Sequence, residues 1–374
     1  MRLGLIGNYG ATNVGDDAIL QSLLRSLDDH ELVIFSANPD MWRGDEKTKA
    51  VSLFPLRFSA FFMRAFREAK EALKSVQVVI LGGGGLFCDE GFYAFMLWVW
   101  QIFWIKRFKK PLYIYGAGVG PLKTWWGRWL TRWAYSQADV VTVRDDYSAD
   151  LLRQIGVKTS IQVAADPVFL QPDPVHDAEV HQLNAARKGV RPGLIMISLR
   201  PWSHYDPVTI SCFKAFLSSL QDNKTLEFVF VCMQSYGEDD LKLIQPVLDE
   251  VGGELFIPES FSQLLERMHE AEFAVGMRYH FMIAAILTST PLLPVSYSSK
   301  TESLFVDSPL FSHVLSLDKL SDRKLLDGFK SLSVMYNNAV IYQRSLAKKY
   351  TEKAQENCLD LMKFIKRVDQ FKAK

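Results

Sequence analysis

Three glycine-rich turns, each directly after a short apolar run, constrain the fold of this chain more than any other feature. The turns are GNYGATNVGDD at residues 7–17, GGGG at 82–85 and GAGVGP at 116–121. A segment with helical spacing of apolar residues follows each of them. Apolar strands that alternate with helices are typical of a parallel β-sheet covered on both faces. The sequence therefore predicts an α/β fold.

The same alternation occurs twice along the chain. The polar stretch 171–193, with three prolines and two glycines, separates the two series and is interpreted as a linker. A chain of 374 residues also exceeds the size at which a single core usually stops growing. We expect two doubly wound, Rossmann-like domains at 1–172 and 191–335 that face a central cleft, followed by a helical segment at 336–374. Ligands bind such sheets beyond the carboxyl ends of the strands.

The individual elements follow from the spacing of apolar residues. Predicted strands are 2–7, 32–35, 76–81, 112–115, 140–143, 194–199, 228–232, 254–257, 273–275 and 292–295. Predicted helices are 16–27, 58–74, 92–109, 125–137, 146–155, 207–220, 238–251, 261–270 and 278–288.

Composition excludes several classes of function. The 43 basic and 42 acidic residues nearly cancel, which argues against a nucleic-acid partner. The four cysteines lie far apart and form no CxxC pair, so neither a zinc site nor a disulfide framework is expected. The start MRLGLIGNYG lacks the pattern of a secretion signal. We therefore expect a cytoplasmic protein.

The glycine turns of the first domain have two interpretations. Glycine lets a ligand approach the backbone closely, and a turn before a helix presents N–H groups to an anion. The alternative is tight packing at a strand end. None of the turns is a dinucleotide fingerprint, which disfavours a nicotinamide dehydrogenase. Asp16 and Asp17 open the first predicted helix, where acids either cap the helix or contact a substrate hydroxyl.

The second domain carries a set of cationic side chains, and each follows a predicted strand. Arg200, Arg278, His280 and Lys300 all have this placement. Arginine binds a carboxylate or phosphate through two parallel hydrogen bonds, and histidine transfers protons near neutral pH. A structural salt bridge and a structural histidine are the alternatives for Arg278 and His280 taken singly, but their spacing as Arg-x-His favours a site. His204 is a secondary candidate.

Taken together, the motifs of the chain resemble those of the polysaccharide pyruvyl transferase family. The matching stretches are GNYGATNVGDDAIL at 7–20, VVILGGGGLF at 78–87, YGAGVGPL at 115–122, VRDDYSADLLRQIGV at 143–157, DPVF at 166–169, GMRYHFMIAA at 276–285 and PLLPVSYSSK at 291–300. They occur in the family's order. The chain has Asp16-Asp17 where an Asp-Glu pair is more usual, and this difference keeps the charge.

The resemblance implies a two-domain fold like that of the GT-B glycosyltransferases and the transfer of pyruvate from phosphoenolpyruvate to two hydroxyls of a sugar as a ketal. It implies His280 as the acid/base, and Arg200 and Arg278 as ligands of phosphoenolpyruvate. The carboxylate and phosphate of phosphoenolpyruvate also suit a lysine, so Lys300 is a third candidate ligand. The first domain would then bind the acceptor sugar through polar groups and glycine turns: Asn13, Gly15, Asp16, Asp17, Gly83 and Gly84. Phosphoenolpyruvate is the donor substrate, and we expect no metal and no cofactor.

Two other functions stay open on the sequence alone. One is a nucleotide-sugar glycosyltransferase of similar architecture, and the other is a non-catalytic module that binds a sugar or a phosphate. The sequence names neither the acceptor sugar nor its carrier.

A cluster of tryptophans bears on the question of a membrane. Seven of the nine tryptophans lie between residues 98 and 133, and lysines and arginines lie among them: Lys106, Arg107, Lys109, Lys110, Arg128 and Arg132. One interpretation is that two helices pack on the sheet. The other is a peripheral patch at the inner face of the plasma membrane that meets a lipid-linked acceptor. The apolar run 92–105 is shorter than the about 20 residues that span a bilayer.

Overall fold

The computed structural model divides into two compact units. It describes residues 1–42, 47–56, 60–172, 189–202, 205–221, 225–235 and 239–372. The first unit comprises Met1–Ala11, Asp16–Leu170 and Tyr350–Lys374, and the second comprises Thr12–Gly15 and Gln171–Lys349. Most of the predicted linker, residues 173–188, and the secondary candidate His204 lie outside the described residues.

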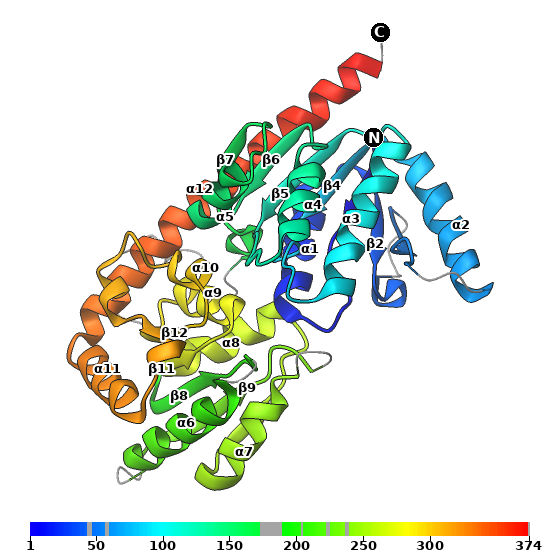
Figure 1. Ribbon diagram of the computed structural model, residues 1–374. Coiled ribbons are helices and arrows are strands. Elements are labelled where there is room, and N and C mark those ends of the chain that lie inside the picture. Colours follow the sequence, from blue (N-terminus) through cyan, green and yellow to red (C-terminus); the bar gives the residue numbers. More distant parts are fainter. Residues whose placement is uncertain are drawn as a thin grey trace. The chain divides into compact units, whose positions relative to one another are not determined.

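The first unit is built on a seven-stranded parallel sheet (Figure 1). Its order is β3-β2-β1-β4-β5-β6-β7. The strands are β1 Arg2–Ile6, β2 Glu31–Ser36, β3 Thr48–Ser52, β4 Val78–Gly82, β5 Leu112–Ala117, β6 Val140–Val143 and β7 Ile161–Val163. The five inner strands match the prediction. The prediction lacked β3 and β7, because edge strands this short and this polar (TKAVS and IQV) carry little apolar signal.

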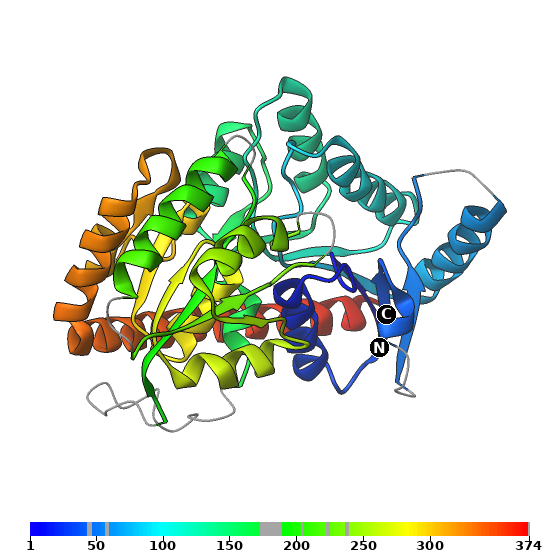
Figure 2. The ribbon, with the colours of Figure 1, turned by 90° about the horizontal axis from the view of Figure 1, so that it is seen from below.

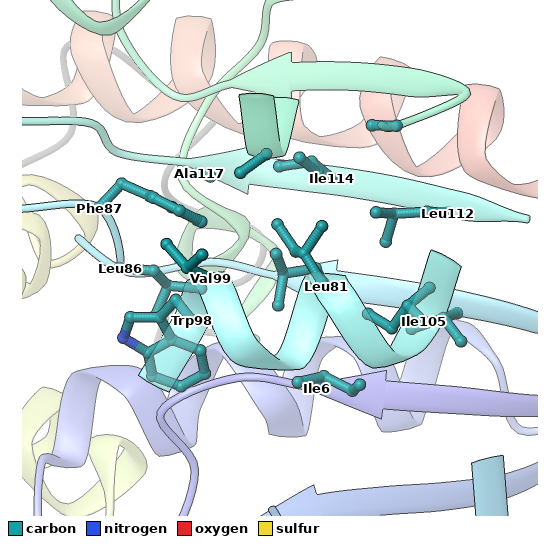
Figure 3. Close-up of a cluster of buried hydrophobic side chains, with 14 of the residues drawn as sticks. Ile6, Leu81, Leu86, Phe87, Trp98, Val99, Ile105, Leu112, Ile114 and Ala117 are labelled. Carbon is teal, nitrogen blue, oxygen red and sulfur yellow. The ribbon is translucent and has the colours of Figure 1, made fainter. Parts of the chain in front are cut away.

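Helices cover both faces of this sheet. They are α1 Val14–Ser26, α2 Ala60–Ser75, α3 Phe92–Arg107, α4 Trp125–Tyr135 and α5 Asp146–Gln154, with the 3₁₀ turns Pro39–Trp42 and Pro167–Leu170. On one face, Leu81 and Ile114 pack with Val99 and Ile105 of α3 in a continuous core (Figure 3). Strand side chains alternate between the two faces, so Tyr113 points the other way.

The long C-terminal helix α12, Tyr336–Lys372, is labelled in Figure 1. Tyr113 contacts this helix. The hydroxyl of Tyr113 donates to Asn357 Oδ1 at 3.2 Å, and its ring centroid lies 5.4 Å from that of Phe364. Residues 336–349 of the helix belong to the second unit, and the residues from Tyr350 onward belong to the first.

Helix α3 contains the most apolar run of the sequence. Phe95, Trp98, Ile102 and Ile105 are buried on its inner side. Gln101 is also buried, and its side-chain amide exchanges hydrogen bonds of 3.0 and 2.9 Å with the backbone of Phe54. A glutamine is thus accommodated because both of its polar atoms have partners. Within the residues that the structure describes, none of the helices is both long enough and apolar enough to cross a membrane.

The second unit contains a six-stranded parallel sheet in the order β10-β9-β8-β11-β12-β13. The strands are β8 Arg191–Ser198, β9 Glu227–Val231, β10 Glu254–Phe256, β11 Ala271–Gly276, β12 Leu292–Ser296 and β13 Leu315–Ser316. The helices are α6 Asp206–Leu220, α7 Leu241–Val251, α8 Phe261–Glu270, α9 Tyr279–Leu287, α10 Ser299–Glu302 and α11 Asp322–Val334, with 3₁₀ turns at Pro309–His313 and Leu317–Lys319. Figure 2 shows helices on both sides of these strands. The prediction of two doubly wound α/β units is confirmed.

Candidate active site

Helix α9 places a single polar side chain at the edge of the second sheet. Seven of its apolar residues, together with Tyr279, are buried, while His280 is partly exposed. A helix that is apolar on all sides is held in the core. His280 is its second residue, directly after the carboxyl end of β11. The imidazole is therefore carried by a rigid element at the edge where ligands bind.

The His280 ring packs directly on the backbone of Gly15. A Cβ atom at Gly15 would lie 1.9 Å from Nδ1 and 2.1 Å from Cγ of His280. Real Cβ atoms show no such contacts, so the absence of a side chain at Gly15 is what lets the imidazole occupy this position. The sequence offered no signal for this pairing, since 265 positions separate the two residues.

Asn13 fixes the segment that carries Gly15. Its Oδ1 accepts the N–H of Gly15 at 3.1 Å, and its Nδ2 donates to Gln234 Oε1 at 3.4 Å. Asn13 and Gln234 also form an isolated antiparallel bridge. The segment Thr12–Gly15 consequently belongs to the second unit, although the surrounding residues belong to the first. That Asn13 and Gly15 bind the substrate stays a prediction.

Arg278 forms a buried pair with Asp240. Its Nε donates to both carboxylate oxygens, at 3.0 and 3.1 Å, and its Nη2 donates to Oδ1. Asp240 Oδ2 also accepts the N–H groups of Met233 and Gln234, at 3.0 and 3.2 Å. Burial raises the pKa of Asp240 above its ordinary value, and the guanidinium of Arg278 acts in the opposite direction.

Asp240 was missed by sequence reasoning, because an acid ahead of a helix is usually a helix-start residue. The pair fixes the plane of the guanidinium and offsets its charge. The role of Arg278 as a ligand of phosphoenolpyruvate stays a prediction, with one added condition. The substrate must reach N–H groups that Asp240 does not occupy.

Arg200 lies between two aromatic rings. Its Cζ is 4.5 Å from the ring centroid of Tyr297 and 5.2 Å from that of Trp202. Its Nη1 donates to the Tyr297 hydroxyl at 2.5 Å. The two aromatic residues follow β12 and β8, so the structure brings the ends of these strands together around the guanidinium. Neither aromatic residue was predicted, although both stand in loops directly after predicted strands.

Lys300 is buried within the short helix α10 that follows β12. Because β8, β11 and β12 are neighbours and parallel, their carboxyl ends share one edge of the sheet. The four predicted cationic residues therefore all follow strands that end at this edge: Arg200, Arg278, His280 and Lys300.

In the first unit, two carboxylates connect the loops that follow the strands. Asp16 Oδ2 accepts from Asn8 Nδ2 at 2.8 Å, and Asp17 Oδ1 accepts the N–H of Gly10 at 2.7 Å. Burial, with a smaller contribution from the nearby Asp16, raises the pKa of Asp17 to about 6, although the hydrogen bond from the Gly10 N–H acts in the opposite direction. These contacts give both acids a structural role, and their predicted contact with a substrate hydroxyl stays a prediction.

Gly83 and Gly84 occupy positions that a side chain could not. Both have positive φ angles, of 59° and 72°. A Cβ at Gly83 would lie 2.4 Å from Ile19, and one at Gly84 would lie 2.6 Å from Asp16 Oδ1. Packing thus accounts for both glycines. Their predicted contact with the substrate remains untested.

A buried arginine that sequence reasoning did not single out stands at the same edge of the first sheet. Arg144 follows β6, and its Nη1 donates to Asp166 Oδ2 at 2.7 Å. Its Nε lies 3.7 Å from Asp145 Oδ2. Gly118 allows this approach, since a Cβ there would lie 2.7 Å from Nε. The available signal was an arginine directly after the predicted strand 140–143.

The backbone has the GT-B-like fold of nucleotide-sugar epimerases and glycosyltransferases. UDP-GlcNAc 2-epimerase from Neisseria meningitidis, solved with UDP-GlcNAc, matches with a TM-score of 0.61 and 11% identity, over 95% of this chain and 100% of that one. A mutant O-GlcNAc transferase of Thermobaculum terrenum matches with a TM-score of 0.51 and 11% identity, over 98% of this chain and 67% of that one. Identities this low show the fold alone.

The chain belongs to the polysaccharide pyruvyl transferase family, whose model matches residues 13–299. The amylovoran biosynthesis protein AmsJ of Erwinia amylovora is 21% identical to it, over 94% of this chain and 98% of that protein. The resemblance read from the motifs is thus confirmed. Membership of this family makes the protein a transferase, and AmsJ by its name takes part in making a polysaccharide.

Proposed function

We propose that the protein moves pyruvate from phosphoenolpyruvate onto two hydroxyls of a sugar in a cell-surface polysaccharide or its precursor. The products are a ketal and inorganic phosphate. The observation that carries the proposal is His280, the one partly exposed residue of an otherwise buried, apolar helix, at an edge shared with Arg200, Arg278 and Lys300. Phosphoenolpyruvate bears a carboxylate and a phosphate, which are the groups that such cations recognise.

In the proposed reaction His280 protonates C3 of phosphoenolpyruvate, which becomes a methyl group. The C2 carbon then has oxocarbenium character, and the first sugar hydroxyl adds to it. The C2–O bond to phosphate breaks, and the second hydroxyl closes the ketal. Of the two hydroxyl protons, one restores the imidazolium and the other leaves with phosphate. Arg200 and Lys300 would stabilise the charge of the departing phosphate.

We place the donor on the second unit and the acceptor on the first. The first unit supports this through the polar groups at the ends of its strands, Asn8, Asp16 and Asp17, which suit sugar hydroxyls. The two acceptor hydroxyls must be held in one orientation. Much of the rate would come from this positioning.

The test is incubation of the purified protein with phosphoenolpyruvate and a panel of acceptors. The panel comprises nucleotide sugars, lipid-linked sugars and finished polysaccharide, with phosphate release and mass spectrometry of the acceptor as readouts. We expect phosphate and a ketal in equal amounts. His280→Ala should lower turnover by about 10²–10⁴-fold and leave phosphoenolpyruvate binding largely intact.

Three results would count against the proposal. Transfer from a nucleotide sugar without use of phosphoenolpyruvate would indicate the glycosyltransferase alternative, in keeping with the GT-B-like fold. Binding of sugar or phosphate without turnover would indicate a non-catalytic module. Near-normal turnover by His280→Ala would remove this histidine from the acid role and make His204 the next residue to test.

A further inference from the structure

Helix α4 exposes aromatic and basic side chains along a single face. Trp125 and Trp129 are 79% and 62% exposed, and they stand one helical turn apart. Arg128 and Arg132 are exposed on the same stripe, since positions three and four apart are neighbours on a helix. The opposite face carries the buried residues Gly127, Thr131, Ala134 and Tyr135.

The start of α3 continues this surface. Phe92 and Tyr93 are 56% and 74% exposed. The Phe92 ring centroid lies 5.5 Å from that of Trp126 in α4, in an edge-to-face contact, and the two helices lie side by side (Figure 1). We call Phe92, Tyr93, Trp125 and Trp129, with Arg128 and Arg132, the aromatic–basic patch.

Solvent exposure divides the clustered tryptophans into two groups, which the sequence alone could not distinguish. Trp98 is 4% exposed and packs in the core beside Phe87 and Leu86 (Figure 3). Trp100, Trp104, Trp126 and Trp133 are partly buried against the same core. Packing on the sheet therefore explains these five, and it does not explain Trp125 and Trp129.

The patch carries net positive charge. Lys123, next to it, forms an ion pair of 2.8 Å with Glu90. Arg128 Nε donates to the backbone carbonyl of Leu122 at 3.2 Å. In the part of the chain that the structure describes, neither Arg128 nor Arg132 forms an ion pair with a carboxylate.

We propose that the aromatic–basic patch docks on a bilayer that contains anionic phospholipid. Tryptophan and tyrosine favour the boundary between headgroups and acyl chains, and arginines beside them are attracted to anionic headgroups. The arginines here alternate with the tryptophans along one stripe. Aromatic residues and arginine are also enriched at protein–protein interfaces, so the choice of a lipid surface rests on charge: among the described residues neither arginine pairs with a carboxylate, and an anionic bilayer supplies the counter-charge.

The position of the patch in the fold indicates what docking on a membrane would do for the reaction. Helices α3 and α4 begin just after the loops that follow β4 and β5, at the carboxyl edge of the first sheet. This step rests on the proposed function, which assigns the acceptor to that edge. A docked protein would present the edge to a sugar carried by a lipid in the same bilayer.

The experiment is co-sedimentation of the full chain with vesicles. One set contains phosphatidylcholine alone, and the other contains equal parts of phosphatidylcholine and phosphatidylglycerol. We expect binding to the second set that weakens at high salt. Arg128→Gln with Arg132→Gln should lower the affinity about 25-fold, since a basic residue near an anionic surface is worth about fivefold. Trp125→Ala with Trp129→Ala should abolish binding.

Two control substitutions remove the same kinds of side chain at sites away from the patch. Phe311→Ala removes an exposed aromatic ring, and Arg323→Gln removes an exposed arginine, both in the second unit. Both should bind as the wild type does. Phosphate release with a soluble acceptor should be unchanged in every variant, so failure of vesicle binding and failure of the proposed reaction are distinguishable.

Three outcomes would overturn the inference: no binding of the wild type to anionic vesicles, unchanged binding of the tryptophan variant, or equal loss of binding in the controls. Sedimentation velocity tests a fourth outcome that would overturn it. If the tryptophan variant converts a dimer to a monomer and vesicle binding is absent, the patch is a surface for a second copy of the chain.

Discussion

Alanine at Gly15 would put a methyl group where the His280 imidazole lies. The Cβ would stand 1.9 Å from Nδ1, whereas ordinary contact begins at 3.4 Å. The ring or the segment must therefore move by about 1.5 Å. Gly15 lies in the first turn of α1, and no positive φ is recorded for it. Apart from this clash, alanine should suit the helix at least as well as glycine.

Two effects of Gly15→Ala follow from the size of this shift. Forcing an extra methyl into a packed site typically costs about 1–3 kcal/mol, so the second unit should lose stability. A reacting group displaced by about 1 Å can cost about 10²-fold in rate. We expect kcat to fall by about 10²-fold, while the affinity for phosphoenolpyruvate changes little, because the cations that would bind it do not touch Gly15.

Steady-state kinetics, a direct binding assay and urea unfolding together measure these effects. Gly91→Ala is a matched control, because a Cβ there would meet only Ala94, at an ordinary 3.7 Å. In a His280→Ala background, alanine at Gly15 should cost less stability, although the remaining Cβ of residue 280 still lies at 2.7 Å. Turnover of Gly15→Ala within threefold of the wild type, at unchanged stability, would refute the reasoning.

Three further predictions concern charged groups. Asp240→Asn leaves Arg278 buried without its counter-charge and should cost about 3–5 kcal/mol in urea unfolding, whereas Asp239→Asn should cost little. Tyr297→Phe keeps the ring but removes the acceptor for Arg200, so calorimetry should show about tenfold weaker binding of phosphoenolpyruvate; unchanged affinity would argue against Arg200 as a ligand. Asp17 holds its proton up to about pH 6 when folded and to about 3.8 when unfolded, so its ionisation lowers stability as pH rises between these values. Relative to the wild type, Asp17→Asn should therefore gain up to about 3 kcal/mol between pH 4 and 7, and parallel pH profiles would contradict this.

The sequence predicts the fold well because the inner strands of both sheets are buried on two sides. VVILG and LYIYGA, for example, are continuous apolar runs bounded by glycine, and such runs are hard to misplace. The edge strands Thr48–Ser52 and Leu315–Ser316 were missed for the opposite reason. They are short and half-exposed, and pairing with a neighbouring strand, which a periodicity does not record, is what makes them strands.

The candidate site is predictable only in part, because sequence patterns place residues at strand ends but do not pair them. The positions of Arg200 and His280 after β8 and β11 follow from the alternation of strands and helices. The partners Asp240 and Tyr297 come from other strand ends, and the contact of Gly15 with His280 depends on tertiary folding. None of these pairings has a local signature.

These pairings form one connected set of contacts around the histidine. It runs through six residues of the second unit: Arg278, Asp240, Gln234, Asn13, Gly15 and His280. Arg278 and His280 flank Tyr279, so the circuit closes through the start of α9. In this chain of contacts Asp240 does not touch the imidazole directly. Its carboxylate accepts the backbone N–H of Gln234, and Gln234 in turn pairs with Asn13. The buried Arg278–Asp240 pair and the position of the imidazole would then be coupled, because a shift at Asp240 must pass through Asn13 and Gly15 to the ring. If that coupling operates, Asp240→Asn should lower kcat as well as stability, and Gly15→Ala combined with it should cost less than the sum of the two single changes.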